Sequence, residues 1–530
     1  VGEPAIMVGR RRGLSTAMRL ARASPPTEVD FHNPQLAFAS RSTADLLRGA
    51  AVLAVCSKPW IVRNADTLLG LATKVIGKRA TNRLVRETFY AHFVAGESAL
   101  AIAPKMAALQ KHGVGGILDY AAEADMSVSH VSQISELTDT PNQPARVYPY
   151  LGEANCDANA AAFHAAVRAV ADTTPDGFAA VKVSALGDPK LLERVSDGLV
   201  AMRNVFRALD REGTGRVSAQ VFAREWPQLF NGITIEEAST MFQRIDADAD
   251  GEIDAIDWLN SIPLEDVPAL VKKCRTRGAL FRSALSPGEV DATERTLERL
   301  DAIAARAAHL GVRLMVDAEH TYLQPAIDHA VLHLQRKYNT TYPAIYSTYQ
   351  AYLHDCVPRL RLDMERAKRE GWHFGAKLVR GAYMVHERER AAVHGYPSPI
   401  MPTAEATHAG YAECTQLLLV DCPAPQRTSA MFATHNEASV REVIRLLASG
   451  ESNVPKERVG FGQLLGMADH LTFALGAEGF RSYKYVPYGP LHEVMPYLMR
   501  RAQENCDALS GASVERVMML CEVRRRVLGF

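Results

Sequence analysis

This 530-residue chain has few features that would place it in a special class of protein. No apolar run approaches the roughly 20 residues that span a membrane, and the best candidate, GAAVLAV at 49–55, is far shorter. Neither sign of charge is in excess, because Lys plus Arg and Asp plus Glu both number 60. We therefore expect no membrane-crossing helix and no overall electrostatic attraction to nucleic acid.

Cysteine pairs with the spacing of metal sites or redox motifs are also missing. The eight cysteines are scattered and include no CxxC, which indicates reduced thiols in an intracellular protein. A hydrophobic share of 47% and a charged share of 23% are ordinary for soluble globular proteins. The length allows one large domain with additions, or three ordinary domains.

Acidic residues are absent between Arg10 and Ser24, a stretch rich in arginine that also contains serine and threonine. This composition is typical of a mitochondrial targeting segment, although a basic disordered tail would look similar. We expect residues 1–85 to form a helical segment that serves in targeting or membrane association.

Past residue 110, short β-rich runs alternate with amphipathic helical stretches, several of which end at glycine. Strands are predicted at 115–121, 178–186, 312–319, 344–350, 374–381, 430–436, 459–466 and 482–489. Eight strand–helix repeats favour an α/β fold of the TIM type, a parallel (β/α)8 barrel. An open doubly wound sheet remains the alternative.

Polar residues gather where these predicted strands end. The carboxyl ends of barrel strands meet on one face, and that face carries the chemistry in such folds. The residues concerned are Lys182, Asp317, Glu319, Gln350, Lys377, Arg380, Thr434, His435, Asn436, Gln463 and Tyr485. We expect them to converge on one site.

The interval between the second and third predicted strands, about 125 residues, is too long for one crossover and indicates an insertion. Within it, loops 210–221 and 246–257 begin 36 residues apart, each with glycine at its sixth position and an aliphatic residue at its eighth. This is the frame of paired EF-hands. We place the EF-hand-like insertion at 193–275, between barrel parts at 86–192 and 276–530.

The second loop offers oxygen ligands for Ca²⁺ at the usual positions. They are Asp246, Asp248, Asp250, the carbonyl of Glu252, Asp254 through water, and Asp257. Aspartate at the twelfth position reaches less far than the usual glutamate, which favours weaker binding or Mg²⁺. The first loop ends in Val221 without a carboxylate, so we expect it to bind metal poorly or not at all. An acidic helix–loop–helix without metal is the alternative.

Near the end of the chain, YLMRRAQEN (497–505) sets two arginines side by side on a predicted helix. A helical wheel puts Tyr497, Arg500, Arg501 and Glu504 on one side, opposite an apolar face. Two interpretations stay open from this stretch alone. In the first, the face is solvated and Glu504 forms an ordinary ion pair with Arg500 or Arg501. In the second, the face is a clamp whose two planar guanidiniums hold one carboxylate of a ligand.

Together these motifs resemble the proline dehydrogenase family, flavoenzymes of the inner mitochondrial membrane in eukaryotes. The resemblance runs from FYAHFVAGE (89–97) through VKVSALG, RLMVDAE, KLVRGAY, ATHN, FGQLLGM and YVPYGP to YLMRRAQEN. It covers most of the chain outside the first 85 residues and the insertion. It implies oxidation of L-proline to Δ1-pyrroline-5-carboxylate by hydride transfer to flavin N5 of FAD, with ubiquinone as electron acceptor.

On the substrate side, the resemblance implies that Arg500 and Arg501 hold the proline carboxylate and that Glu504 fixes them. A pair of Lys182 and Asp317 beside the substrate is physically plausible, because each charge lowers the cost of burying the other. The implied substrate contacts are Lys182, Leu464, Tyr485, Tyr497, Arg500, Arg501 and Glu504.

On the flavin side, the resemblance implies a pocket of cations and small residues. Its members are Ala318, Gln350, Lys377, Arg380, Gly381, Ala382, Thr434 and His435. Asp317 and Lys377 are the expected catalytic residues. Bacterial family members usually have arginine and then lysine at the two basic positions of KLVRGAY, so the division of roles between Lys377 and Arg380 stays open.

Hydroxyproline dehydrogenases share most of these motifs but tend to have a smaller residue at the position of Tyr485, so its tyrosine favours proline. Hydroxyproline oxidation remains one alternative, and a Ca²⁺-responsive adaptor on an inactive barrel is another. We expect association with the matrix side of the inner mitochondrial membrane, through the basic N-terminal stretch or the apolar segment 44–56. Regulation by Ca²⁺ is a hypothesis that rests on the second loop.

Overall fold

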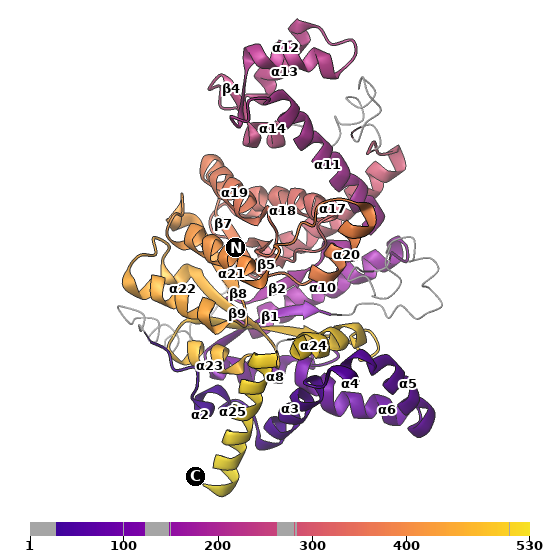
Figure 1. Cartoon of the computed structure of the whole chain (residues 1–530), viewed down its shortest axis with the longest axis vertical. Coiled ribbons are helices and arrows are strands. Elements are labelled where there is room, and N and C mark those ends of the chain that lie inside the picture. Colours follow the sequence, from indigo (N-terminus) through magenta and orange to yellow (C-terminus); the bar gives the residue numbers. More distant parts are fainter. Residues whose placement is uncertain are drawn as a thin grey trace, which may run out of the picture.

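The computed structural model describes residues 28–98, 100–121, 148, 150–261, 280, 283–507 and 509–529, so the predicted targeting stretch lies outside the described residues. Eight parallel strands close into a barrel in the order β1-β10-β9-β8-β7-β6-β5-β2 (Figure 1). They are β1 (Val114–Tyr120), β2 (Phe178–Val181), β5 (Arg313–Val316), β6 (Ile345–Gln350), β7 (Phe374–Val379), β8 (Thr428–Ala433), β9 (Val459–Leu464) and β10 (Arg481–Tyr488). All eight predicted strands are confirmed, and closure of the sheet excludes the open alternative.

Helices cover the outside of the barrel, because parallel strands are apolar on both faces and need a second layer. They are α8 (Ala103–Lys111), α10 (Glu153–Thr173), the first half of α11 (Pro189–Leu209), α17 (Pro287–His309), α18 (Gln324–Tyr338), α19 (Cys356–Glu370), α20 (Met384–His394), α21 (Ala404–Leu419), α22 (Glu437–Ser449) and α23 (Asp469–Ala477). The last two helices, α24 (Met495–Asp507) and α25 (Leu509–Leu528), pack against the N-terminal helices instead. Gly371, Gly395 and Gly450 follow α19, α20 and α22 in the left-handed conformation that suits a helix end. The predicted glycine stops are therefore confirmed for α19 and α22, whereas the stop after α20 was not predicted.

Side chains fill the amino-terminal half of the barrel. The ring centre of Phe178 lies 5.2 Å from that of Tyr346 and 5.1 Å from that of Tyr483. A Cβ added to Gly460 would lie 2.9 Å from the methyl carbon of Met431, so glycine keeps room for that side chain. Packing of this end leaves the carboxyl ends of the strands as the place for a site.

The insertion leaves the barrel through α11 and contains two helix–loop–helix units, seen at the top of Figure 1. Its other elements are β3 (Arg216–Ser218), α12 (Ala219–Leu229), α13 (Ile235–Ile245), β4 (Glu252–Asp254) and α14 (Ala255–Ser261). The two loops pair through antiparallel β3 and β4, which places Val217 opposite Ile253. These are the aliphatic residues at the eighth positions of the two loops, and both are buried.

The predicted start of the insertion at residue 193 falls inside α11, which runs unbroken from the barrel into the first loop. One helix serves both parts because its first half packs against α17 and α18 and its second half against α12 and α14. The predicted end of the insertion, at residue 275, lies outside the described residues.

The N-terminal helices pack beneath the barrel, against the C-terminal helix. They are α2 (Pro34–Ala37), α3 (Thr43–Cys56), α4 (Pro59–Arg63), α5 (Ala65–Ile76) and α6 (Lys78–Val85), followed by the π-helical turn Arg86–Tyr90 and α7 (Ala91–Phe93). Leu46 and Leu53 of α3 share a buried cluster with Met518 and Met519 of α25. The apolar face of residues 44–56, expected to touch a membrane, is thus largely used inside the protein. Within the described part of the chain, no helix combines the length and apolarity needed to cross a membrane.

Candidate active site

Asp317, Lys377 and Tyr485 meet at the carboxyl end of the barrel, although they come from three separate strands. The Nζ atom of Lys377 forms a buried ion pair with Oδ1 of Asp317. The hydroxyl of Tyr485 donates a hydrogen bond of 2.8 Å to Oδ2 of the same carboxylate. The ammonium of Lys377 also lies 5.6 Å from the ring centre of Tyr485. The three side chains form one charged, hydrogen-bonded unit.

Tyr485 keeps its proton in this unit. Burial raises the pKa of Tyr485 well above its ordinary value, and the carboxylates of Asp119 and Asp317 act in the same direction. The phenol therefore stays a donor to Asp317 and presents its ring as one wall of the site.

Lys377, which was expected on the flavin side, is an ion-pair partner of Asp317, while the expected pairing of Lys182 with Asp317 stays a prediction. Lys182 follows β2, and its ammonium lies 5.9 Å from the ring centre of Tyr148. Burial raises the pKa of neighbouring Glu319, whereas hydrogen bonds from Ser184 and the charge of Lys182 oppose this shift. Lys182 thus faces the acidic end of the barrel beside Glu319.

Of the two arginines of α24, Arg501 is buried and Arg500 is half-buried, so their face is not fully solvated. Tyr497 is 4% exposed and Arg501 is 7% exposed. The guanidinium carbons of Arg501 and Arg500 lie 4.9 Å and 5.9 Å from the ring centre of Tyr497. Nη2 of Arg501 pairs with Oε1 of Glu504 at 2.6 Å, while its buried Nε has no hydrogen-bond partner among the residues that the structure describes. The arrangement fits a clamp that still has a donor to offer.

Helix α24 lies across the ends of strands β8 to β10. Tyr497 and Leu498 share an apolar cluster with Leu464, the last residue of β9. Burial lowers the pKa of His435, at the end of β8, to about 3, and the charges of Lys484 and Arg501 contribute to this shift. These contacts bring the arginine pair close to the strand-end residues.

His435 is consequently a neutral side chain. The backbone N–H of Leu464 donates to its Nε2 at 3.1 Å, so the ring proton resides on Nδ1. A neutral imidazole fixed in this way ties the end of β8 to the end of β9, and it offers one N–H toward the site.

Arg380 is held by several neighbours beside β8. Its Nη1 donates to Oγ1 of Thr434 at 2.7 Å, and its Nη2 donates to Oγ of Ser439 at 2.9 Å. The guanidinium stacks 4.5 Å from the ring centre of Tyr411. Lys377 therefore contacts Asp317, whereas Arg380 contacts Thr434 and Ser439, and the division of their roles stays a prediction.

Several predicted flavin contacts have features that a bound cofactor would satisfy. Gln350 is 1% exposed, and its buried Oε1 lacks a hydrogen-bond partner among the described residues. Gly381 has φ 134°, and a Cβ there would lie 2.4 Å from the Tyr352 ring, so only glycine fits. Ala318 is buried and Ala382 is exposed. The unpaired acceptor of Gln350, the cations Lys377 and Arg380 and the small residues together suit a binding site for FAD.

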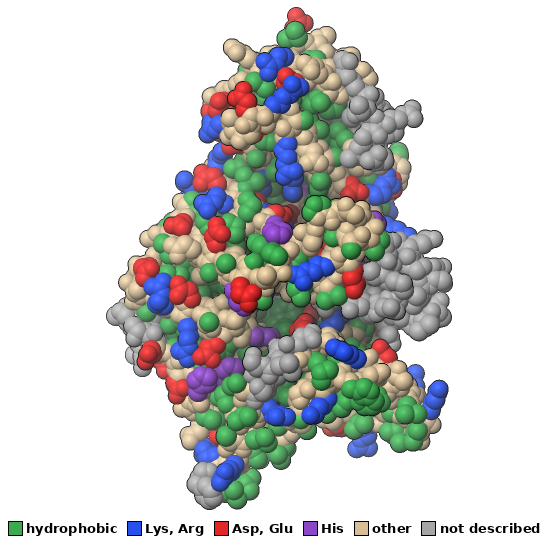
Figure 2. All heavy atoms as spheres, viewed as in Figure 1, with side chains coloured by type: hydrophobic (Ala, Val, Ile, Leu, Met, Phe, Trp, Pro, Cys, Tyr) green, Lys and Arg blue, Asp and Glu red, His purple; other side chains and the backbone are tan. Residues whose placement is uncertain are grey.

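The face seen in Figure 2 is hollowed near the middle of the molecule, close to where Figure 1 labels α21 and α24. Hydrophobic and acidic side chains border this hollow, and histidine side chains lie beside it.

A buried network beneath Leu464 escaped the sequence reasoning. Lys484 is fully buried, donates to the carbonyls of Leu464 at 3.2 Å and Met467 at 2.6 Å, and pairs with Asp469 at 2.9 Å. Asp469 also pairs with Arg41 at 2.5 Å. The network fixes the loop after β9, and no local pattern could reveal it because its members come from three distant segments.

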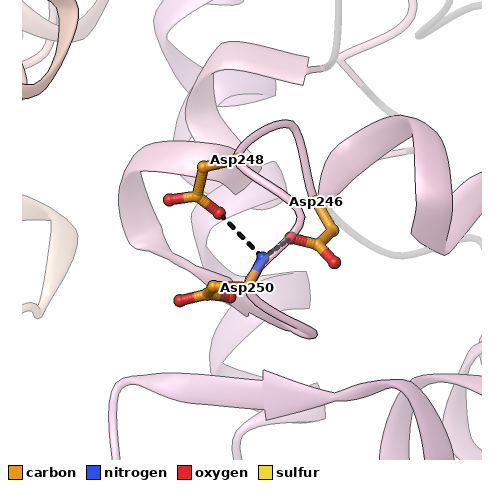
Figure 3. Close-up of side chains that lie close together, drawn as sticks. All are labelled: Asp246, Asp248 and Asp250. Atoms are coloured by element: carbon orange, nitrogen blue, oxygen red, sulfur yellow. Dashed lines mark hydrogen bonds between the residues drawn. The ribbon is translucent and has the colours of Figure 1, made fainter.

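The second loop of the insertion brings three carboxylates together. One ligand oxygen each from Asp246, Asp248 and Asp250 lies within 4.8 Å of the others (Figure 3). The backbone N–H of Asp250 donates to Asp246 at 3.1 Å and to Asp248 at 3.4 Å. These three oxygens form part of a candidate set of ligands for a metal ion.

The other predicted ligands of this loop have cationic partners. Arg369, from barrel helix α19, pairs with Asp254 at 2.5 Å, with Asp257 at 3.2 Å and with Asp248 at 3.5 Å. The side chain of Glu252 pairs with Arg216 at 2.7 Å. The predicted ligand set is therefore only partly assembled, because an internal guanidinium occupies its far side.

Comparison with known proteins shows the family of this chain. A family model described as proline dehydrogenase matches residues 103–513. Proline dehydrogenase 1, mitochondrial, from Homo sapiens is 37% identical over 97% of this chain and 92% of that protein. Hydroxyproline dehydrogenase from Bos taurus is 32% identical over 93% of this chain and 92% of that protein.

A solved structure adds support for the fold alone. Proline utilization A from Bdellovibrio bacteriovorus matches with a TM-score of 0.54 at 16% identity, covering 93% of this chain and 40% of that chain. The family model spans most of the barrel and α24, and similarity to the human protein extends over nearly all of the chain. The chain belongs to the proline dehydrogenase family.

Proposed function

We propose that this protein oxidises L-proline to Δ1-pyrroline-5-carboxylate with FAD as cofactor. The observation that carries the proposal is the position of Arg500 and Arg501, on the helix that crosses the ends of β8 to β10 and packs against Leu464. Guanidiniums bind a carboxylate in a bidentate manner. This arrangement suits a small amino acid with one carboxylate and an apolar ring.

The residues of the chain would act mainly by binding and orienting proline. Arg500 and Arg501 hold its carboxylate, and the ion pair to Glu504 fixes the orientation of Arg501. The pyrrolidine ring would lie between the rings of Tyr485 and Tyr497 and the side chain of Leu464, the last residue of β9. Their burial keeps water from the reacting carbon.

Asp317 orients the amine of the substrate. Its two oxygens are engaged by Lys377 and Tyr485, from opposite sides of the carboxylate. A carboxylate fixed in this way directs the nitrogen, and thereby the neighbouring carbon, toward the flavin side of the site. Lys182 adds positive charge at the same end of the barrel.

The cofactor FAD would be held on the side of the site away from the arginine clamp. Gln350, Arg380, Thr434 and His435 supply polar contacts for FAD there, Lys377 adds its charge from the Asp317 side, and small residues leave space for the cofactor. When bound, FAD supplies the acceptor for the hydride that leaves the carbon beside the proline nitrogen.

A visible spectrum of the purified protein tests this function directly. Flavin absorption bands should be present, and anaerobic addition of L-proline should bleach them. Missing bands, or bands that proline leaves unchanged, would refute the assignment. An inactive barrel that serves as a Ca²⁺-responsive adaptor predicts this second outcome. The buried Lys377–Asp317 pair argues against it, because such a charged pair is costly unless function retains it.

Hydroxyproline is the second candidate substrate, since a hydroxyproline dehydrogenase is among the similar proteins. The full phenol of Tyr485, held against Asp317 by its hydroxyl, leaves less room for an added hydroxyl group than a smaller residue would. Proline is therefore the preferred substrate in this proposal.

We also propose that the surface of α4, α5 and α6 contacts the inner mitochondrial membrane, where ubiquinone would take up the electrons. Trp60 is 68% exposed, Leu71 is 57% exposed and Val75 is 72% exposed. Lys74 and Lys78 lie beside them and are exposed as well. Exposed apolar side chains with neighbouring cations are typical of an interfacial helix on an anionic membrane. The mitochondrial name of the human relative agrees with this location.

Vesicle flotation distinguishes this surface from the rest of the protein. Wild-type protein should float with vesicles that contain anionic lipid and less with pure phosphatidylcholine. The double variant Leu71→Ser, Val75→Ser should lose most of this binding while proline oxidation with a soluble dye continues. Val393→Ser, at a residue of α20 that is 58% exposed, is the matched control. Equal flotation of both variants would reject the proposed surface.

Finally, we propose that the second loop is an EF-hand-like site that binds Ca²⁺ weakly and modulates the enzyme. Support comes from the converging oxygens of Asp246, Asp248 and Asp250 and from the β3–β4 pairing that joins the two loops. Proline turnover and transfer of electrons to quinone should change when Ca²⁺ replaces a chelator. Unchanged rates would reject the modulation.

A further inference from the structure

A cavity of about 360 Å³ lies where the insertion meets the barrel. Its walls come from α11 and α14 of the insertion and from α18, α19 and β6 of the barrel. This volume is within the range of small-molecule pockets. Its lining includes none of the residues assigned above to the active site or to the ligand set of the second loop, although Ala255 of that loop lies in it.

Three arginines give this cavity its polar character. Arg203 comes from α11, and Arg359 and Arg366 come from α19. In the described part of the chain, the Nε of each arginine and Nη2 of Arg359 lack a hydrogen-bond partner. Arg366 is only 4% exposed. A buried donor left unpaired costs roughly 1–3 kcal/mol, so four such donors at one cavity indicate a place for an acceptor.

The acidic neighbours use only part of this donor capacity. Nη1 of Arg359 pairs with Asp328 at 2.8 Å, and Nη1 of Arg366 pairs with Asp363 at 2.9 Å. Asp363 also accepts a hydrogen bond of 2.9 Å from the hydroxyl of Tyr349. Burial raises the pKa of Asp363, although the charge of Arg366 opposes the shift. A third carboxylate, that of Asp355, also lines the cavity, and its charge acts on Arg203 and Arg359.

Much of the remaining lining is apolar, although His329, Gln335 and Ser347 also belong to it. Leu199 and Phe206 of α11, Trp258 of α14 and Leu332 of α18 line the cavity. A fully hydrophilic anion such as phosphate would satisfy the arginines but would leave this surface in contact with water. An anion with a hydrocarbon body satisfies both parts of the lining.

We propose that this cavity is a binding site for a small monocarboxylate with an apolar body. The carboxylate accepts from the free N–H groups of Arg203, Arg359 and Arg366, and the body packs against Trp258 and Leu332. The bound molecule would touch the insertion and the barrel at once. Tyr349, which lines the cavity, directly precedes Gln350, the expected flavin contact at the end of β6.

Fluorine NMR with 4,4,4-trifluorobutyrate tests the site in the flavin-loaded protein. The Arg501→Met variant serves as background, because the proposed proline clamp would otherwise bind the same carboxylate. The probe should bind this background, and the uncharged 4,4,4-trifluorobutanol should bind more weakly. Inorganic phosphate at equal concentration should fail to displace the probe.

Two further variants locate the binding. Arg203→Met should weaken probe binding by about tenfold or more, as expected for loss of a charged hydrogen bond. Leu199→Trp should weaken it by filling the cavity without changing charge. Arg361→Met, an exposed position of α19 outside the cavity, should leave it unchanged. Binding that is absent from the background, or that is unaffected by both cavity variants, would overturn the proposal.

Discussion

At the scale of single residues, Arg501 depends on its surroundings for its role. The helical wheel separates YLMRRAQEN into an apolar and a polar side, yet Tyr497 and Arg501 are both buried. The reason is that α24 lies between the strand ends and the N-terminal helices α3 and α4, so two of its faces are covered. Periodicity describes one helix and contains no information about a second covering element.

Replacing Arg501 by methionine tests the clamp. Methionine keeps much of the apolar packing on Tyr497 but removes the guanidinium that pairs with Glu504. We expect KM for proline to rise by about tenfold to a hundredfold, as for loss of a charged hydrogen bond of about 1.5–3 kcal/mol. Steady-state kinetics gives KM, and the flavin spectrum of the variant should stay normal. A wild-type KM would refute the clamp.

Tyr485 offers a test of substrate choice. Tyr485→Ser removes the ring that walls the site and the hydroxyl that donates to Asp317. We expect kcat/KM for proline to fall and the ratio of hydroxyproline to proline activity to rise by about tenfold. Tyr485→Phe is the control, because it deletes only the hydroxyl and keeps the steric wall. If both variants keep the wild-type ratio, the ring does not select the substrate.

At the scale of elements, the insertion combines predicted and unpredicted features. Loop positions six and eight follow the expected frame, with Gly251 at φ 88° and Val217 paired with Ile253. The contact between Arg369 and this loop was not predicted, because α19 is more than a hundred residues away in sequence. Sequence spacing defines ligands within a loop, whereas competing cations come from whichever element packs beside it.

Arg369→Met should strengthen Ca²⁺ binding at the second loop. The guanidinium pairs with Asp248, Asp254 and Asp257, so an incoming cation must displace it. Calorimetric titration should show tighter binding in the variant, by about threefold to tenfold for the loss of partly exposed ion pairs. Lys368→Met on the same helix is the control. Equal affinities would show that Arg369 does not compete with the metal.

At the scale of the whole molecule, five histidines that are buried or half-buried link stability to pH. Burial lowers the pKa of His92 and His435 to about 3 and that of His329, His386 and His470 to about 4, from 6.5. Between these values the unfolded chain binds more protons than the folded one. Stability should therefore be greatest above pH 6.5 and fall as pH decreases toward 4.

Thermal unfolding of the flavin-loaded protein between pH 7.5 and 5 measures this effect. We expect the unfolding temperature to fall steadily across that interval, with the steepest change below pH 6.5. A double variant, His329→Gln with His386→Gln, should show a shallower decline, because glutamine has no proton to gain. An unfolding temperature that is constant over the interval would contradict the prediction.

Sequence alone determined the order of the eight strands, the types of residue at their ends and the frame of the two loops. These features are local, since they depend on alternation, helix stops and spacing along the chain. Tertiary structure decided that Lys377 pairs with Asp317, that Arg369 reaches the second loop and that α25 covers α3. Ion pairs and packing depend on which side chains meet in space, and residues far apart in sequence meet only after the barrel has closed.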